Sequence, residues 1–290
     1  MKQLLVFAAL LLLSAQAEAF EVSDLRISAA GSQPVAATVF SADESSLQVK
    51  VLSATQLRKP TGYDSAVNVS VRDLARRGTS LRSVISRPPR SDLLLLNGGF
   101  SGSQADRPVG LLVVGGKTLS IPSYSRIPGE RSGNCPHVRN ERYRLSGLFC
   151  VRDGGQILVT SFSDGTFASC REAIQAGPVL IEQRQVAVCP KPVGSDLAAR
   201  TAVCTDRAPD GRSLVKFVVT RDPISLHDLA SWMQKPPERG GLGCDSAINL
   251  SGDDSSGAAF FQRNSKNLAA DLVVGEGSYP QASFLAVISK

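Results

Sequence analysis

The residues best suited to chemistry lie in the stretch 249–257, which reads Asn-Leu-Ser-Gly-Asp-Asp-Ser-Ser-Gly. Two adjacent carboxylates, Asp253 and Asp254, follow a short apolar run, and Ser255 and Ser256 come next. Carboxylates serve as general acids or bases, and small residues let the backbone approach a ligand. The abrupt change favours a strand whose end opens onto a cleft. The other interpretation is an acidic, serine-rich surface turn.

A second segment has the same character. The apolar run 93–96 (Leu-Leu-Leu-Leu) predicts a strand buried on both faces, and it stops at Asn97-Gly98-Gly99. The amide of Asn97 could donate and accept hydrogen bonds to a ligand, while Gly98 and Gly99 bring the backbone close. Asn-Gly is also a strong hairpin signal, so a simple turn is the alternative.

Two further polar residues stand at expected element boundaries. Gln175 ends a predicted helical stretch, 167–175, where Gly177-Pro178 breaks the helix and a strand follows. Arg200 begins a predicted strand, and its guanidinium offers paired donors that suit phosphate oxygens. A structural salt bridge is the other interpretation of Arg200.

These residues need a framework of short strands with a few helices. The clearest helix is 225–235, where Ser225 can cap the first turn, Asp228 occupies the capping-box position, and Pro236-Pro237 ends it. Another helix is expected at 67–74. Strands are expected at 46–52, 93–96, 111–114, 156–160, 179–181, 199–203, 247–250, 272–274 and 284–288. We therefore expect a mixed α/β (α+β) fold, a single domain with a strand-rich core and flanking helices.

The first 19 residues predict a targeting segment. Lys2 precedes the apolar run 4–13, and Ala17-Glu18-Ala19 resembles a signal-peptidase site. The run is too short to span a bilayer, and no later stretch is long enough. We expect residues 20–290 to form one exported domain, periplasmic or secreted, with no transmembrane segment.

The six cysteines predict disulfides, because their number is even and the chain is expected to be exported. Our expected pairs are Cys135–Cys150, Cys189–Cys204 and Cys170–Cys244, although the spacing allows others. With only two histidines and no Cys-x-x-Cys, a zinc site is not expected. Disulfide bonding also argues against a cysteine nucleophile.

The formal net charge of +6 points to anionic partners such as phosphoesters or envelope polysaccharide, unless the arginines only keep the surface soluble. Aromatic residues make up only 6% of the chain and are not interleaved with basic ones. Nucleic acid is therefore not an expected partner.

Taken in order, four segments resemble the phosphodiester glycosidase family. They are Asn97-Gly98-Gly99-Phe100, Gln175-Ala176-Gly177-Pro178, Arg200-Thr201-Ala202 and Asn249-Leu250 with its following glycine and serines. The resemblance runs from about residue 46 to the C-terminus. It implies one cleft around a sugar-phosphate and hydrolysis of the bond between the anomeric carbon and a phosphodiester oxygen. The residues implied to bind substrate are Asn97, Gly98, Gly99, Gln175, Gly177, Arg200, Gly252, Ser255 and Ser256. Asn249 is implied to act in catalysis, and we add Asp253 and Asp254 as candidate catalytic carboxylates because they follow closely in the chain.

The chain departs from the family pattern at its last segment. Where the family reads Asn-Leu-Asp-Gly-Gly-Gly-Ser-Ser, this chain has Ser251 for the aspartate and Asp253-Asp254 in the glycine run. A hydroxyl is not ionised at neutral pH, so a carboxylate would have to act from a shifted position. Three interpretations stay open: an active enzyme of this kind, an enzyme for another anionic sugar, and an inactive member that binds envelope glycan or a protein.

Other hydrolase mechanisms have less support in the sequence. No Gly-x-Ser-x-Gly surrounds any serine, and only His137 and His227 could serve as a histidine base. No cofactor is expected, and a divalent metal and the oligomeric state are left open.

Overall fold

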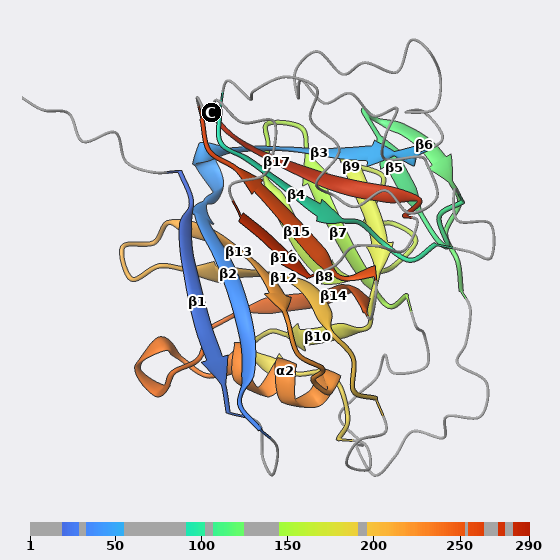
Figure 1. Ribbon diagram of the computed structural model, residues 1–290. Coiled ribbons are helices and arrows are strands. Elements are labelled where there is room, and N and C mark those ends of the chain that lie inside the picture. The colour runs from blue at the N-terminus through green and yellow to red at the C-terminus, as the bar shows by residue number, and fades with distance from the viewer. Residues whose placement is uncertain are drawn as a thin grey trace, which may run out of the picture.

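The computed structural model describes residues 19–28, 33–54, 91–101, 107–124, 145–190, 196–252, 255–263, 272–275 and 281–290. Within these ranges the chain forms three antiparallel sheets (Figure 1). The only α-helix bounded within them is α2 (Leu226–Gln234), and η1 (Glu44–Ser46) and η3 (Pro237–Arg239) are short 3-10 turns. The expected α+β class is therefore wrong, because the protein is mostly β.

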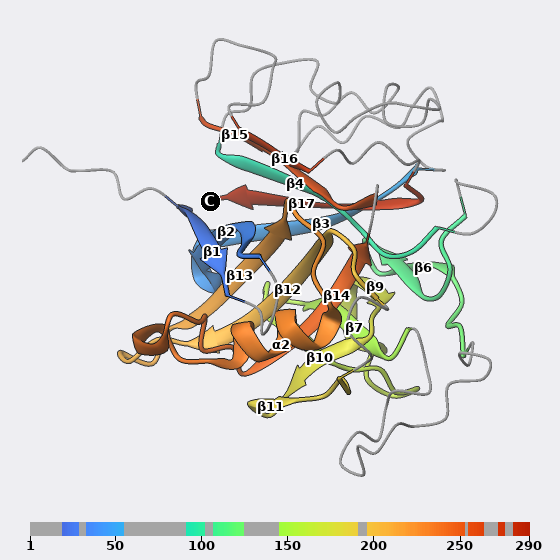
Figure 2. The same cartoon turned by 60° about the horizontal axis from the view of Figure 1, so that its bottom comes forward.

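The largest sheet, called here the seven-stranded sheet, carries α2 on one face (Figure 2). Its strands, in spatial order, are β1 (Glu21–Ile27), β2 (Val35–Asp43), β13 (Ser213–Thr220), β12 (Arg200–Arg207), β14 (Ser246–Gly252), β10 (Val179–Glu182) and β11 (Gln185–Val186). Leu229 and Met233 of α2 pack with Ala202 and Val218 of the sheet. Burial of this apolar helix face joins α2 to the sheet.

Two five-stranded sheets complete the fold. The β4 sheet has the order β16 (Leu272–Gly275), β15 (Gly257–Phe261), β4 (Leu93–Asn97), β17 (Ser283–Ser289) and β3 (Leu47–Ser53). The β9 sheet has the order β6 (Lys117–Ser120), β5 (Leu112–Val114), β9 (Cys170–Ala176), β7 (Gly147–Arg152) and β8 (Ile157–Ser161).

One hydrophobic cluster lies between all three sheets. It includes Phe217 of the seven-stranded sheet, Leu94 and Leu285 of the β4 sheet, and Phe149 and Ile174 of the β9 sheet. Every strand in the list of expected strands is present; most ends shift by no more than two residues, and the strand expected at 199–203 extends to Arg207 as β12. Short apolar runs of this length are typical of strands buried in a sheet, which explains why these strands could be predicted from the sequence.

The helix predicted at 225–235 is present as α2, but the structure does not bear out the other two helix predictions. Residues 167–175 were expected to be helical, but Cys170–Ala176 form β9, the central strand of its sheet. Hydrogen bonds to β5 and β7 on both sides outweigh the helical preference of residues such as Glu172 and Ala173. The helix expected at 67–74 lies outside the described residues.

Disulfides are present, but the expected pairing is wrong. Cys150 bonds Cys170 across β7 and β9, with Cα atoms 5.5 Å apart, and Cys204 bonds Cys244 with Cα atoms 5.9 Å apart. Cys189 is disulfide-bonded as well. Neighbouring strands bring each described pair within bonding distance, and pairing across strands cannot be deduced from spacing.

Candidate functional site

The predicted site residues lie where the ends of several strands from all three sheets meet. Asn97 ends β4, Gln175 stands one residue before the end of β9, and Arg200 begins β12. Arg200 is paired in register with Gly252, the last residue of β14. The group formed by these four residues with Gly98, Gly99, Gly177, Asn249, Ser255 and Ser256 is called the motif cluster below.

Asn97 bonds the first residue of β15, Gly257, which also contacts Thr201 of the seven-stranded sheet. Its side chain is fully buried, and its Oδ1 accepts a hydrogen bond from Gly257 N at 3.0 Å. The same N–H lies 3.2 Å from Thr201 Oγ1, and Asn97 Nδ2 donates to Gly98 O at 3.3 Å. Thr201 was not among the predicted site residues, although it follows Arg200 in the Arg-Thr-Ala segment. Asn97 therefore fixes how β4 meets the segment after Ser256.

The two glycines after Asn97 allow close backbone contact. Gly98 N donates to Ser283 O at 2.9 Å, and Gly99 N donates to Ser283 Oγ at 3.2 Å. A Cβ at Gly98 would lie 2.7 Å from the backbone carbon of Ser283, and one at Gly99 would lie 3.0 Å from Gln175 O. Because β4 pairs with β15 and β17, Asn97-Gly98 does not close a hairpin.

Gln175 is a buried clamp on three backbone segments. Its Oε1 accepts from Leu111 N and Ser123 N, each at 2.9 Å. Its Nε2 donates to Ser123 O at 2.8 Å and to Leu145 O at 3.0 Å. These four bonds use both donors and both lone pairs of the amide. Gln175 is thus suited to positioning the loops around the site.

Asn249 brings β14 against the Gly177-Pro178 turn. Its Nδ2 donates to Gly177 O at 2.9 Å, and its backbone N donates to Pro178 O at 3.0 Å. The side chain is 1% exposed, yet among the described residues Oδ1 has no hydrogen-bond partner. A buried oxygen without a donor is costly, and such groups often mark a place for water or a ligand.

Arg200 is anchored against the end of β14. Its guanidinium donates to Ile224 O at 3.4 Å and also to Asp196 O, and its backbone N donates to Thr220 Oγ1 at 2.8 Å. A Cβ at Gly252 would lie 2.8 Å from Arg200 Nη1. The guanidinium therefore lies against the residue that precedes Asp253-Asp254 in the chain.

The segment beyond β14 is also tied to β12. Ser256 is buried, and its hydroxyl lies 3.1 Å from Ala199 O and 3.4 Å from Ser251 O. Ser251 is buried as well, and Ser255 is half-buried. Asp253 and Asp254 lie outside the described residues. In the sequence they lie between Gly252, which contacts the Arg200 guanidinium, and Ser255.

A match with a family model decides to which family the chain belongs. The model described as phosphodiester glycosidase matches residues 93–275, which include every predicted site residue. This chain belongs to the phosphodiester glycosidase family. The family match confirms the resemblance seen in the sequence.

One solved structure has a similar fold, and a second matches with a lower score. A zebrafish N-acetylglucosamine-1-phosphodiester alpha-N-acetylglucosaminidase, described as a catalytic domain auto-inhibited by its pro-peptide, matches with a TM-score of 0.51 and 16% identity, over 95% of this chain and 85% of that chain. A protein from Burkholderia pseudomallei matches with a TM-score of 0.40 and 13% identity, over 89% of this chain and 74% of that chain. No curated protein matches the sequence.

Two other features of the described residues bear on function. The described residues contain no group of three or more His, Cys, Asp or Glu side chains arranged to hold a metal ion. No helix in this part of the chain is long and apolar enough to cross a membrane.

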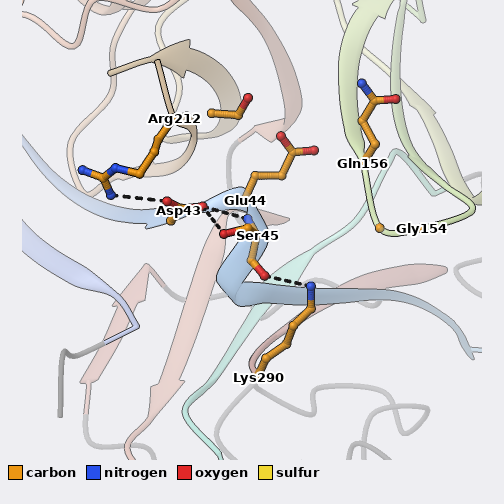
Figure 3. A pocket seen from close by; sticks show the side chains of 9 residues that line it. Asp43, Glu44, Ser45, Gly154, Gln156, Arg212 and Lys290 are labelled. Atoms are coloured by element: carbon orange, nitrogen blue, oxygen red, sulfur yellow. Dashed lines mark hydrogen bonds and ion pairs between the residues drawn. The ribbon is translucent and has the colours of Figure 1, made fainter. Parts of the chain in front are cut away.

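A separate pocket of about 500 Å³ lies at the opposite end of β13 from the motif cluster (Figure 3). Each of its charged side chains already has a hydrogen-bond partner within the protein. Asp43 accepts bonds from Ser45 and from Arg212, and Lys290 donates to Ser45 O at 2.9 Å. The hydroxyl of Ser45 is the main reason that the pKa of Asp43 is lowered. This internal pairing distinguishes the pocket from the motif cluster, where Asn249 Oδ1 has no described partner.

Proposed function

We propose that the protein is an exported hydrolase that cleaves the bond between the anomeric carbon of a sugar and a phosphodiester oxygen. One observation carries the proposal: the family segments, which are scattered from residue 97 to residue 256, are linked into one cluster by buried contacts. Asn97 bonds Gly257, Asn249 bonds Gly177, and Gly252 lies against Arg200. Among the described residues the buried Asn249 Oδ1 has no hydrogen-bond partner, so it could accept a bond from a ligand.

In the proposed reaction, water adds to the anomeric carbon, the carbon–oxygen bond breaks, and a phosphomonoester leaves. Arg200 would hold the phosphate charge, because its guanidinium is already fixed by backbone carbonyls and needs little reorganisation. Asp253 or Asp254 would take the proton of the attacking water. Asn249 Oδ1 would accept a hydrogen bond from the sugar.

The positioning residues act without touching the reacting atoms. The amide groups of Asn97 and Gln175 form hydrogen bonds with backbone groups, so these residues would hold the loops that shape the site. Gly98, Gly99 and Gly252 would matter because side chains there would displace Ser283, Gln175 or Arg200. The Gly177 carbonyl accepts a bond from Asn249, and the Ser256 hydroxyl bonds Ala199 O beside Arg200; Ser255 is proposed to contact substrate.

The second candidate function is glycan or protein binding without catalysis. It is favoured by Ser251, which stands where the family has an aspartate, and by side chains in place of family glycines. A buried serine cannot supply a carboxylate at that position.

Release of N-acetylglucosamine from its 1-(methyl phosphodiester) separates the two candidates. The active-enzyme proposal expects turnover by the wild type and a loss of roughly 100-fold or more in Asp253→Asn/Asp254→Asn, in line with removal of a general base. Ser251→Asp provides the reciprocal variant. Turnover by Ser251→Asp alone would establish a binding protein derived from an enzyme, and full activity of the double variant would rule out the shifted carboxylates.

The proposed location is outside the cytoplasm. The predicted targeting segment and the presence of disulfides both support it, because disulfides persist in oxidising compartments. Fractionation of expressing cells, with and without residues 1–19, tests this proposal. Retention of the full-length protein in the cytoplasm would contradict it.

A further inference from the structure

A row of aromatic rings lies on the face of the β9 sheet that points away from the shared core. The rings of Tyr124 and Phe162 have centroids 6.0 Å apart, and those of Phe162 and Phe167 are 5.9 Å apart and nearly parallel, at 11°. Phe162 and Phe167 pack on the apolar side chains of this face, including Leu111 and Leu148. We call Tyr124, Phe162 and Phe167 the aromatic row.

The aromatic row is partly buried at Phe162 and Phe167 and exposed at Tyr124. Phe162 and Phe167 are half-buried, whereas Tyr124 is 55% exposed and the nearby Ile121 is 78% exposed. The hydroxyl of Tyr124 donates to Asp164, an exposed carboxylate in the turn between Phe162 and Phe167. The aromatic rings therefore lie beside two polar groups, the Tyr124 hydroxyl and the Asp164 carboxylate.

Two chains of hydrogen bonds connect the aromatic row to the motif cluster. Ser123, which precedes Tyr124, is held at both its N–H and its C=O by the Gln175 side chain. Phe162 N donates to Ser146 O at 2.7 Å, and Ser146 Oγ accepts from Val179 N at 3.0 Å, two residues after Gly177. The row therefore begins at the same end of the β9 sheet as Gln175 and Gly177.

We propose that the aromatic row binds the sugar chain of a substrate that extends beyond the scissile bond. Sugar rings present apolar C–H faces that pack on aromatic rings, and their hydroxyls need hydrogen-bond partners at the ring edges. The row offers both, through its ring faces and through the carboxylate of Asp164. A protein or lipid partner would favour a broader apolar surface without a charged edge.

The inference rests on the proposed function for its placement beside a glycosidase site, but binding is measurable without turnover. The probes are three neutral tetrasaccharides, of N-acetylglucosamine, glucose and mannose, titrated calorimetrically into the full chain. We expect saturable binding of at least one. Tyr124→Ala should weaken it by roughly 5- to 10-fold because one exposed stacking surface is lost.

Matched variants separate stacking from other effects. Tyr124→Phe keeps the ring, and its affinity should stay within about two-fold of wild type if stacking dominates. Val22→Ala removes a similarly exposed apolar side chain from β1 and should change nothing. Thermal unfolding checks that Tyr124→Ala remains folded, as expected for an exposed side chain.

The outcomes distinguish this inference from the proposed function. Absence of binding by all three tetrasaccharides, or binding that Tyr124→Ala leaves unchanged, overturns the inference even if the methyl phosphodiester is hydrolysed. Tyr124-dependent binding by a protein that does not hydrolyse the diester supports the inference and contradicts the proposed reaction.

Discussion

Close packing dictates the residue type at Gly98. We expect Gly98→Ala to lower the free energy of unfolding by about 1–3 kcal/mol, because the new Cβ would meet the Ser283 backbone at 2.7 Å. Gly165→Ala is the matched control, since a Cβ there meets nothing within 4 Å. Urea denaturation of the two variants measures the difference. If Gly98→Ala and Gly165→Ala were equally stable, the Ser283 backbone would have moved aside at little cost.

The sequence predicted that the motif residues lie together, but not which groups their side chains bond. Asn97 was expected to bond a ligand through its amide and Gln175 was a polar residue at an expected element boundary, but both side chains bond backbone groups. The sequence carries no sign of these partners, because Gly257 and Ser123 come from distant segments. Thr201 and Ser283 were missed for the same reason: their contacts arise only when the sheets meet.

At the level of elements, α2 is a helix whose start is specified by its local sequence. Ser225 Oγ accepts from Asp228 N at 3.0 Å and donates to the Asp228 carboxylate at 2.7 Å. Ser225→Ala should therefore destabilise the protein by about 1 kcal/mol, a typical value for losing an N-cap. Ser231→Ala, within the same helix, should have a smaller effect. Chemical denaturation checks both, and a loss as large in Ser231→Ala would exclude capping as the cause.

β9 shows the opposite case. Its residues Cys170–Ala176 include good helix formers, but the strand lies between β5 and β7 and its apolar residues fill both faces. Only the neighbouring strands make this conformation favourable, so a local pattern could not reveal it. Because Gln175 lies on β9, the same tertiary pairing also places the clamp at the site.

At the scale of the whole molecule, disulfides connect strands that are distant in sequence. Cys204→Ala/Cys244→Ala opens a link with a sequence separation of 40 residues, and we expect it to lower the free energy of unfolding by about 2–5 kcal/mol. Denaturation with and without dithiothreitol measures this loss. The reductant should destabilise the wild type more than the variant, and an equal effect on both would show that this bond contributes little.

Glu172 links two sheets through a buried carboxyl group. On β9, its Oε2 accepts from Val51 N of β3, and its Oε1 accepts from Gly115 N, each at 3.2 Å. Burial raises the pKa of Glu172, and the two backbone hydrogen bonds offset this only in part. The carboxyl group therefore keeps its proton in the folded protein at pH values where an unfolded chain has lost it.

A raised pKa in the folded state means that Glu172 favours folding most at low pH, and that this contribution falls as pH rises. The fall begins near the ordinary value of 4.5, where the unfolded chain ionises, and ends above the raised folded pKa. We expect the difference in unfolding free energy between wild type and Glu172→Gln to decline across this window, by at most about 1.4 kcal/mol per pH unit. Urea denaturation from pH 4 upward measures it, with the exposed Glu238→Gln as control. A difference that stays constant with pH, or grows as pH rises, would show that hydrogen bonds to the carboxylate outweigh its burial between the sheets.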